Sequence, residues 1–331
     1  MRRLAAGVLL LGSFSCAAQT EAERLIEAGH WKQARAIVEA NGGQSRDALT
    51  QFLRSQIHNA FGDHDSPLPL AEKAVALDGT IAKYHRQIAE VTGVMAQHAG
   101  LFQQLLLARR FRREIDIALS LDPRDLQALR DLMEFYLLAP GIAGGDKEKA
   151  QATAARIARV DTVQGYLAQA RLAEAAGATT RQEEMLRKAV DAGPSHYRAR
   201  TALGGFLLRQ KRWQEASQQA DIAIKIDNKR VDAYAILAGA YAYLARTADL
   251  ELLLTLAEKQ VPDDLSPYYR AAEALLLQGQ NLEGAQRYLG RYLSAPPEGN
   301  APSLSEAREK MGQLMAKARS ISGTRAMPGP G

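Results

Sequence analysis

The feature that most constrains this chain is a helix-ending motif that recurs at a constant interval of about 34 residues. The motif ends in Pro or, once, in Asn, and it occurs as Gly193-Pro194, Asp227-Asn228, Val261-Pro262 and Ala295-Pro296. Proline stops a helix because its ring removes a backbone donor and clashes with the preceding turn. Self-similarity at one fixed period indicates a chain built from stacked copies of one supersecondary unit.

The residues between these endings repeat as well, and they predict two helices in each unit. Leu203-Gly204 falls in a first predicted helix, where a small residue lets a neighbouring helix approach closely. In the second predicted helix, steps of four and three residues place several alanines on one face. These alanines are Ala216, Ala220 and Ala223. The next unit carries a similar apolar pattern at Tyr234, Leu237, Ala238, Tyr241, Leu250, Leu254 and Ala257. The unit after it carries Tyr268, Ala271, Ala272, Leu275, Ala285 and Tyr288.

With this Leu–small pair, these alanines and the following Pro, the chain resembles the tetratricopeptide repeat family, whose period is about 34 residues. The resemblance is strong over 163–296 and looser over 21–162, where the endings at Gly79, Pro123 and Thr162 are more widely and unevenly spaced. We therefore expect insertions in these irregular repeats. The resemblance implies an all-α, right-handed superhelical solenoid over residues 19–319, with seven or eight helix–turn–helix hairpins.

The composition agrees with a helical solenoid. Hydrophobic residues make up 47% of the chain and aromatic residues only 6%. Ala, Leu, Arg, Glu and Gln favour helix because they lose little rotamer freedom there. No alternating run of β-branched residues predicts a sheet. Because one hairpin cannot bury its apolar face alone, stacked hairpins must bury it against each other.

The end of the chain predicts a cap and then a tail. Ser303 and Glu306 form a capping-box pattern at the start of a predicted helix, 303–319. An apolar stripe faces the solenoid there and the other face is charged. The Gly- and Pro-rich residues 320–331 have too little apolar surface to pack and are expected to be disordered.

Residues 1–18 have the layout of a secretory signal peptide. Arg2 and Arg3 precede a short apolar run, which is too short to span a bilayer, and Cys16-Ala17-Ala18 suits cleavage before Gln19. We expect an exported bacterial-type protein that is periplasmic or secreted, with no transmembrane segment after signal removal. The alternative is a lipoprotein anchored through Cys16, the only cysteine, although Ser13 stands where such a signal has Leu.

The overall charge does not indicate a polyanionic partner. The formal net charge is +5, and removal of the predicted signal peptide leaves 40 basic and 37 acidic residues. The run Arg109-Arg110-Phe111-Arg112-Arg113 is the densest basic segment. We interpret it as a solvated helix face with Phe111 and Ile115 turned inward, and contact with an acidic partner or lipid headgroups is the alternative. No nucleic acid is expected as a partner of an exported chain.

The segment 139–147, Ala-Pro-Gly-Ile-Ala-Gly-Gly-Asp-Lys, is the most unusual local feature. A phosphate loop needs Gly, four residues, then Gly-Lys-Ser/Thr after a strand, and this segment does not match. We expect an enlarged turn between helices at about 125–138 and 147–159. His58, Asp63, His64 and Asp65 match no zinc spacing, and we interpret them as a polar turn. We predict no catalytic residue, no metal and no cofactor.

In the tetratricopeptide repeat family, the first helix of each hairpin lines a concave groove. Carrying the repeat register onto this chain predicts that Arg198 and Arg209 meet a carboxylate and that Tyr243 and Tyr269 anchor apolar groups. Tyr and Arg are favoured at binding hot spots. The predicted partner-binding residues are Arg130, Glu134, Arg171, Arg198, Arg209, Tyr243, Tyr269 and Glu273.

The sequence therefore favours a non-catalytic interaction scaffold of the cell envelope or secreted space, which holds a protein or peptide segment of unknown identity in this groove. Two alternatives remain open. One is an envelope solenoid that binds a glycan or small ligand. The other is an enzyme, or a subunit of one, that uses the Gly-rich segment 139–147.

Overall fold

The computed structural model describes residues 18–42, 47–63 and 66–325, and all regular secondary structure in these residues is helical. The predicted all-α class is therefore confirmed. The predicted signal peptide, apart from Ala18, lies outside the described residues, as do His64, Asp65 and residues 326–331. Residues 18–28 form the first helical stretch.

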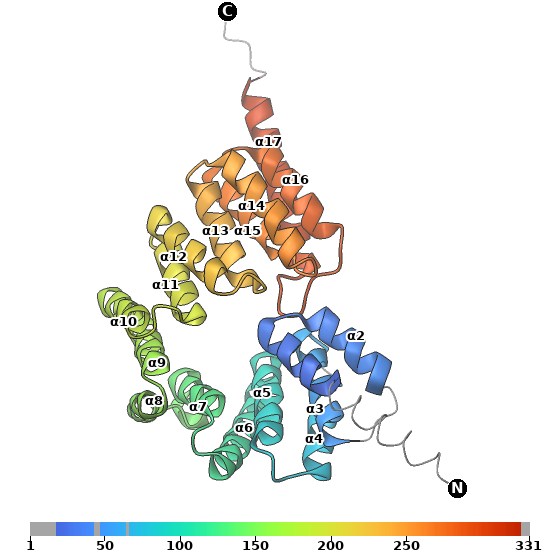
Figure 1. Cartoon of the computed structure of the whole chain (residues 1–331), viewed down its shortest axis with the longest axis vertical. Helices are drawn as coiled ribbons and strands as arrows, with labels where there is room; N and C mark the ends of the chain where they lie inside the picture. The colour runs from blue at the N-terminus through green and yellow to red at the C-terminus, as the bar shows by residue number, and fades with distance from the viewer. Residues whose placement is uncertain (1–17, 43–46, 64–65, 326–331) are drawn as a thin grey trace, which may run out of the picture. The chain divides into compact units, whose positions relative to one another are not determined.

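The remaining helices follow one another with short connections (Figure 1). Their bounds are α2 Trp31–Gly42, α3 Ala48–Ala60, α4 Pro67–Leu77, α5 Ala82–His98, α6 Leu101–Leu121, α7 Leu126–Leu138, η1 Gly141–Ala143 (a 3-10 turn), α8 Lys147–Val160, α9 Thr162–Ala175, α10 Thr179–Ala192, α11 Tyr197–Arg209, α12 Trp213–Ile226, α13 Val231–Tyr243, α14 Thr247–Gln260, α15 Ser266–Gln278, α16 Leu282–Leu293 and α17 Leu304–Arg325.

The chain divides into two compact units, the first ending at Gly193 and the second beginning at Pro194. Within each unit, successive helices pack side by side as hairpins, such as α5 with α6 and α11 with α12 (Figure 1). Each hairpin also packs on the next, as α7 and α8 pack on α9 and as α13 packs on α15. This stacking of helical hairpins is the arrangement expected of a repeat solenoid.

The first unit contains one unusually long hairpin. α5 has 17 residues and α6 has 21, and only Ala99 and Gly100 join them. The wide spacing between Gly79 and Pro123 therefore arises from longer helices and not from an inserted loop. Gly93 allows the two helices to approach, since a Cβ there would lie 3.3 Å from the Phe111 ring.

The other irregular spacing is an enlarged turn, as predicted. α7 and α8 begin and end within one residue of the expected positions. Between them, Gly144 adopts a left-handed conformation, with φ of 106°, and ends the η1 turn. The backbone N–H of Asp146 then donates to the carbonyl of Tyr136 at 2.7 Å, which closes the turn against the end of α7.

The regular hairpins follow the repeat register. Helices begin at Thr162, Tyr197, Val231 and Ser266, within one residue of the predicted 163, 197, 231 and 265. The alanines expected on the inner face of α12 (Ala216, Ala220 and Ala223) are all fully buried. The Tyr197 hydroxyl accepts from the backbone N–H of Ala233 at 3.1 Å, which ties α11 to α13.

The last helix differs from its predicted length. Ser303 and Glu306 form the expected reciprocal cap, with Ser303 N–H donating to Glu306 Oε2 at 2.6 Å and Glu306 N–H donating to Ser303 Oγ at 3.2 Å. The helix then continues to Arg325 and not to 319, so the expectation of a disordered segment from 320 is wrong as far as Arg325. Gly323 is tolerated because one helical glycine costs only about 1 kcal/mol.

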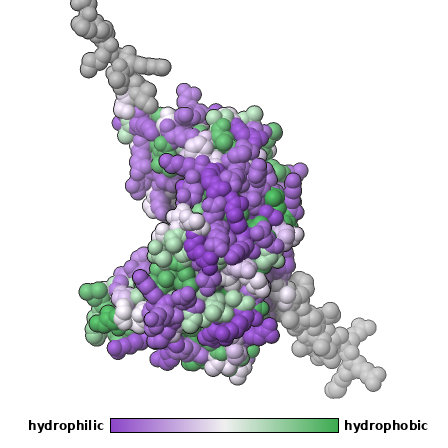
Figure 2. Space-filling view, turned by 90° about the vertical axis from the view of Figure 1, so that its left-hand side faces the viewer, coloured by the Kyte–Doolittle hydropathy of each residue, from purple (hydrophilic) through white to green (hydrophobic). Residues whose placement is uncertain are grey.

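Hydrophilic side chains dominate the face drawn in Figure 2, and separate hydrophobic areas interrupt them. Most large apolar side chains are buried, but Leu101 and Phe102 at the start of α6 are exposed. Within the described residues, no helix combines the length and the apolar character that crossing a membrane requires.

Candidate partner-binding groove

A hollow of about 400 Å³ opens on the second unit, over the first helices of three consecutive hairpins. α11 contributes Gly205, Leu208 and Arg209, α13 contributes Gly239 and Tyr243, and α15 contributes Arg270, Glu273 and Ala274. Three of the eight predicted groove residues therefore meet in one place. They meet because each occupies an equivalent register position, and stacked hairpins bring equivalent positions side by side.

Two glycines keep the floor of this hollow open. A Cβ at Gly239 would lie 3.3 Å from Leu208 Cδ2, which is closer than ordinary packing allows. A Cβ at Gly205 would lie 3.7 Å from the Arg209 guanidinium and would take up space in the hollow. The missing side chains therefore leave room for a ligand between α11 and α13.

Tyr243 forms a rigid wall of the hollow. Its ring stacks on Trp213, with centroids 5.1 Å apart and planes 6° from parallel. Its backbone carbonyl accepts from Gln278 Nε2 at 2.9 Å. Burial and the nearby Glu273 carboxylate raise the pKa of the Tyr243 hydroxyl, so it stays protonated at neutral pH and can donate a hydrogen bond. A preorganised aromatic side chain loses little entropy when a ligand packs against it.

Of the described residues that line the hollow, only Glu273 carries a carboxylate, and two cations hold it. Lys310 of α17 contacts it at 2.7 Å and Arg270 contacts it at 2.9 Å. Burial raises the pKa of Glu273, but the hydrogen bonds from Lys310 and Arg270 outweigh burial and hold the pKa below its usual value. Arg209, Arg270 and Lys310 together outnumber this carboxylate, so the hollow keeps a net positive character.

The remaining predicted groove residues of the second unit do not line this hollow. Arg198 is exposed at the first turn of α11. Tyr269 is only 4% exposed and packs on Tyr292, with ring centroids 5.3 Å apart. The prediction that Tyr269 anchors a ligand is therefore not supported by its position. The α15 face bearing Tyr269 turns into the core against α16, where burial of an aromatic ring is favourable.

The predicted groove residues of the first unit bridge neighbouring helices. Arg171 of α9 holds Glu134 of α7 through two parallel contacts, at 2.8 and 3.0 Å. Arg130 of α7 donates to Gln164 of α9 at 2.9 Å. The register thus places these side chains on facing helices, but their polar groups already form hydrogen bonds and ion pairs with one another.

The other segments considered from sequence have structural roles. Asp146 caps α8, because its carboxylate accepts from the backbone N–H groups of Glu148 and Lys149, each at 3.0 Å. These hydrogen bonds lower the pKa of Asp146, and the bond from the Lys149 amide contributes most. His58 contacts Asp63 at 2.9 Å. Within the described ranges, no group of three or more His, Cys, Asp or Glu side chains is placed to hold a metal ion.

Sequence reasoning missed three residues that shape the hollow. The repeat position of Trp213 predicts packing, but it does not identify Tyr243 as the stacking partner. Arg270 lies one turn before Glu273, and this spacing could have indicated the ion pair. Lys310 falls on the charged face of the predicted capping helix, and no local signal places it beside α15.

The comparisons with known proteins concern the fold. No protein-family model matches the chain, and no curated protein sequence matches it. Among solved structures, the chain is similar to yeast Tom70, with a TM-score of 0.57 at 15% identity. This match covers 88% of the chain but 60% of the Tom70 chain, so the chain spans less than two thirds of that protein.

Two further structures match less well. One is the Cut9-Hcn1 hetero-tetramer of APC/C, with a TM-score of 0.47 at 15% identity over 89% of this chain and 54% of that chain. The other is TTC0263, a tetratricopeptide-repeat protein of Thermus thermophilus, with 0.43 at 19% identity over 58% and 98%. The stacked hairpins and the Tom70 match together show a tetratricopeptide-repeat-like fold.

Proposed function

We propose that this protein is a non-catalytic scaffold that binds a peptide segment of a partner protein in the hollow over α11, α13 and α15. The observation that carries the proposal is the position of Arg209 and Arg270 beside the stacked ring of Tyr243. An apolar side chain of the peptide packs on Tyr243, and a neighbouring carboxylate meets the arginines. Such a rigid aromatic anchor with adjacent charge is typical of binding hot spots.

The proposed setting is the cell envelope or secreted space of a bacterium. It rests on the Arg2-Arg3 start, the short apolar run and the small residues before Gln19. Mass spectrometry of the mature N-terminus tests it. A chain that begins at Gln19 supports export with cleavage, a lipid on Cys16 supports the lipoprotein alternative, and an intact Met1 contradicts both.

Site-specific photo-crosslinking in cells tests the hollow. A photoreactive amino acid replaces Tyr243 in one variant and Leu252 in a matched control, because Leu252 of α14 is 72% exposed and does not line the hollow. We expect a covalent partner protein from position 243 and not from 252. Equal crosslinking at both positions, or none at 243, would contradict the proposal.

Affinity measurements on the recovered partner segment then sharpen the result. Tyr243→Ala is expected to weaken binding by about 2 kcal/mol, the size of a hot-spot loss. Arg198→Glu alters an exposed side chain of the same unit that lies outside the hollow. As a control, it is expected to change affinity little. Saturable binding of cell-wall fragments that Tyr243→Ala abolishes would instead support the ligand-binding alternative.

A further inference from the structure

A second, larger concave surface lies on the first unit, between α6, the η1 turn and α8. It consists of two adjoining hollows of about 620 and 440 Å³, which share residues of α6, α7 and α8. The shared residues are Arg112, Asp116, Ser120, Tyr136 and Lys149. We call this surface the basic cleft. It joins the two segments that stand out in the sequence, the arginine run of α6 and the Gly-rich turn.

Positive charge dominates the basic cleft. Among the residues that the structure describes, its lining holds five cationic side chains and a single carboxylate, that of Asp116. A cleft lined by one sign of charge attracts ligands of the opposite sign and raises their rate of association. The five cations are Arg109, Arg112, Arg113, Lys149 and Arg156.

The cations differ in the hydrogen bonds and ion pairs that they already form within the protein. Arg112 contacts Asp116 at 2.8 Å and the Tyr136 hydroxyl, and Lys149 contacts Asp146 at 3.1 Å. No side-chain hydrogen bond or ion pair joins the guanidinium of Arg109 or of Arg156 to any part of the chain that the structure describes. These two side chains, at opposite lobes of the cleft, retain their full capacity for an anionic ligand.

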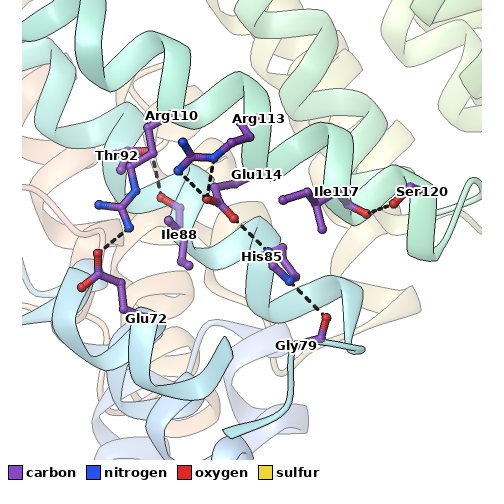
Figure 3. A network of polar contacts seen from close by, with 10 residues as sticks. All are labelled: Glu72, Gly79, His85, Ile88, Thr92, Arg110, Arg113, Glu114, Ile117 and Ser120. Atoms are coloured by element: carbon purple, nitrogen blue, oxygen red, sulfur yellow. Dashed lines mark hydrogen bonds and ion pairs between the residues drawn. The ribbon is translucent and has the colours of Figure 1, made fainter. Parts of the chain in front are cut away.

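The arginine run is held in a fixed orientation by its other members. Arg110 pairs with Glu72 of α4, and Arg113 contacts Glu114 at 3.0 Å (Figure 3). Glu114 in turn contacts His85 of α5 at 2.8 Å, and both side chains are buried. α6 is thus fastened to α4 and α5 on one side, and this contact network sets the direction in which Arg109 and Arg112 leave the helix.

The opposite wall of the basic cleft is apolar and rigid. Phe135 stacks on Phe111, with ring centroids 5.2 Å apart and planes 14° from parallel. Gly144 covers the Phe135 ring, since a Cβ there would lie 3.4 Å from it. Gly145 admits no side chain, because a Cβ would lie 1.7 Å from the Ala139 carbonyl oxygen. The Gly-rich turn therefore closes tightly and exposes an aromatic edge beside the cations.

We propose that the basic cleft binds an acidic peptide segment of a partner protein, with carboxylates on Arg109 and Arg156 and an apolar side chain against Phe135. An extended segment fits because Arg109 lines one lobe of the cleft and Arg156 lines the other. Arginine forks suit carboxylates because they donate two parallel hydrogen bonds. The site belongs to the first unit, and it does not depend on the proposed hollow of the second.

Fluorescence anisotropy with the full chain tests this proposal. The probe is a labelled peptide of alternating Glu and Leu, and its counterpart carries Gln in place of Glu. We expect the Glu peptide to bind the wild type. Arg109→Glu/Arg156→Glu is expected to weaken binding on the order of tenfold or more, because it replaces two charges that attract an acidic peptide with two that repel it. The Gln peptide is expected to bind far more weakly than the Glu peptide.

Two variants make the result specific. Arg198→Glu/Lys259→Glu changes the net charge equally at two exposed positions of the other unit that do not line its hollow, and it is expected to leave affinity within about twofold, since distant surface charges are screened. Gly145→Ala leaves the charge unchanged but disrupts the turn, and it is expected to weaken binding while circular dichroism shows an unchanged helical content.

Three results would overturn the proposal. One is equal weakening by both double variants, which indicates attraction by net charge alone. Another is unchanged affinity in Arg109→Glu/Arg156→Glu. A third is that the protein binds phosphatidylglycerol vesicles through Arg109 and Arg156 but does not bind the Glu peptide. This result would assign the cleft to a membrane surface. None of these results depends on whether Tyr243 captures a partner.

Discussion

The two units build the same helical hairpins with different interiors. Among the described residues, most buried polar side chains belong to the first unit, and they include His85, Glu114 and Gln164. In the second unit, only Ser217, Ser266 and Glu298 are buried polar residues of the described chain, and alanine, leucine and tyrosine form most of the remaining interior. In regular repeats, small and apolar residues meet between each hairpin and the next. Irregular repeats bring buried polar groups together, and these groups must form hydrogen bonds with each other.

The two proposed binding surfaces follow the same division. The regular second unit stacks equivalent helix positions into the hollow around Tyr243. The irregular first unit forms the basic cleft from residues of the long helix α6, of α7 and α8, and of the enlarged turn between them. The comparison indicates that regular repeats place an aromatic ring beside the charges of one surface, whereas the long helix and the enlarged turn gather five cations around the other.

The largest expected effect concerns the apolar interior of the second unit. Leu254 of α14 is 1% exposed. Leu254→Ala is expected to lower the free energy of unfolding by about 2–5 kcal/mol, because it removes buried methyl groups and leaves a cavity. Urea unfolding measures the loss. Leu252→Ala on the same helix, at an exposed position, is expected to stay within about 0.5 kcal/mol, and a similar loss in both variants would contradict the assigned interior.

A smaller effect is expected from the polar interior of the first unit. Glu114→Gln keeps the shape but removes the charge that faces His85 and Arg113, and it is expected to cost about 1–3 kcal/mol. Thermal unfolding and hydrogen exchange of α5 and α6 measure it. Asp116→Asn on the exposed side of α6 provides the matched control, since a surface ion pair contributes only about 0–1 kcal/mol. Equal losses would show that burial of Glu114 does not matter.

The third expected effect depends on pH and concerns Asp131 of α7. Burial and the nearby Glu90 carboxylate raise its pKa from 3.8 to about 7. One of its oxygens accepts from Gln127 at 2.7 Å, and the other has no hydrogen-bond partner in the described structure. Because the folded state binds this proton more tightly than the unfolded state, stability is full below about pH 4 and falls as pH rises through 7.

Asp131→Asn removes this cost of ionisation. The variant is expected to be more stable than the wild type by up to about 4 kcal/mol at pH 8, with the difference shrinking toward pH 4. Melting temperatures across this pH range measure the difference. A constant offset between variant and wild type at all pH values would show that titration of Asp131 does not contribute.

Much of the second unit could be predicted from residues alone. A constant repeat period assigns each position to a helix and to a face, so the sequence places Arg209, Tyr243 and Glu273 on the groove side. The same periodicity could not show that Tyr269 turns inward. Helix register defines a face only to within part of a turn, and the neighbouring α16 decides which edge of that face is covered.

The sequence by itself determined the helical hairpins, their register in the regular repeats and the enlarged turn, because turn residues and apolar periodicity act over short stretches of chain. Only the tertiary structure decided that the long spacing after Gly79 lengthens two helices, and that Arg109, Tyr136 and Arg156 share one cleft. These residues lie on α6, α7 and α8, and side chains so far apart in sequence meet only through the packing of whole helices. Local propensity carries no information about that packing.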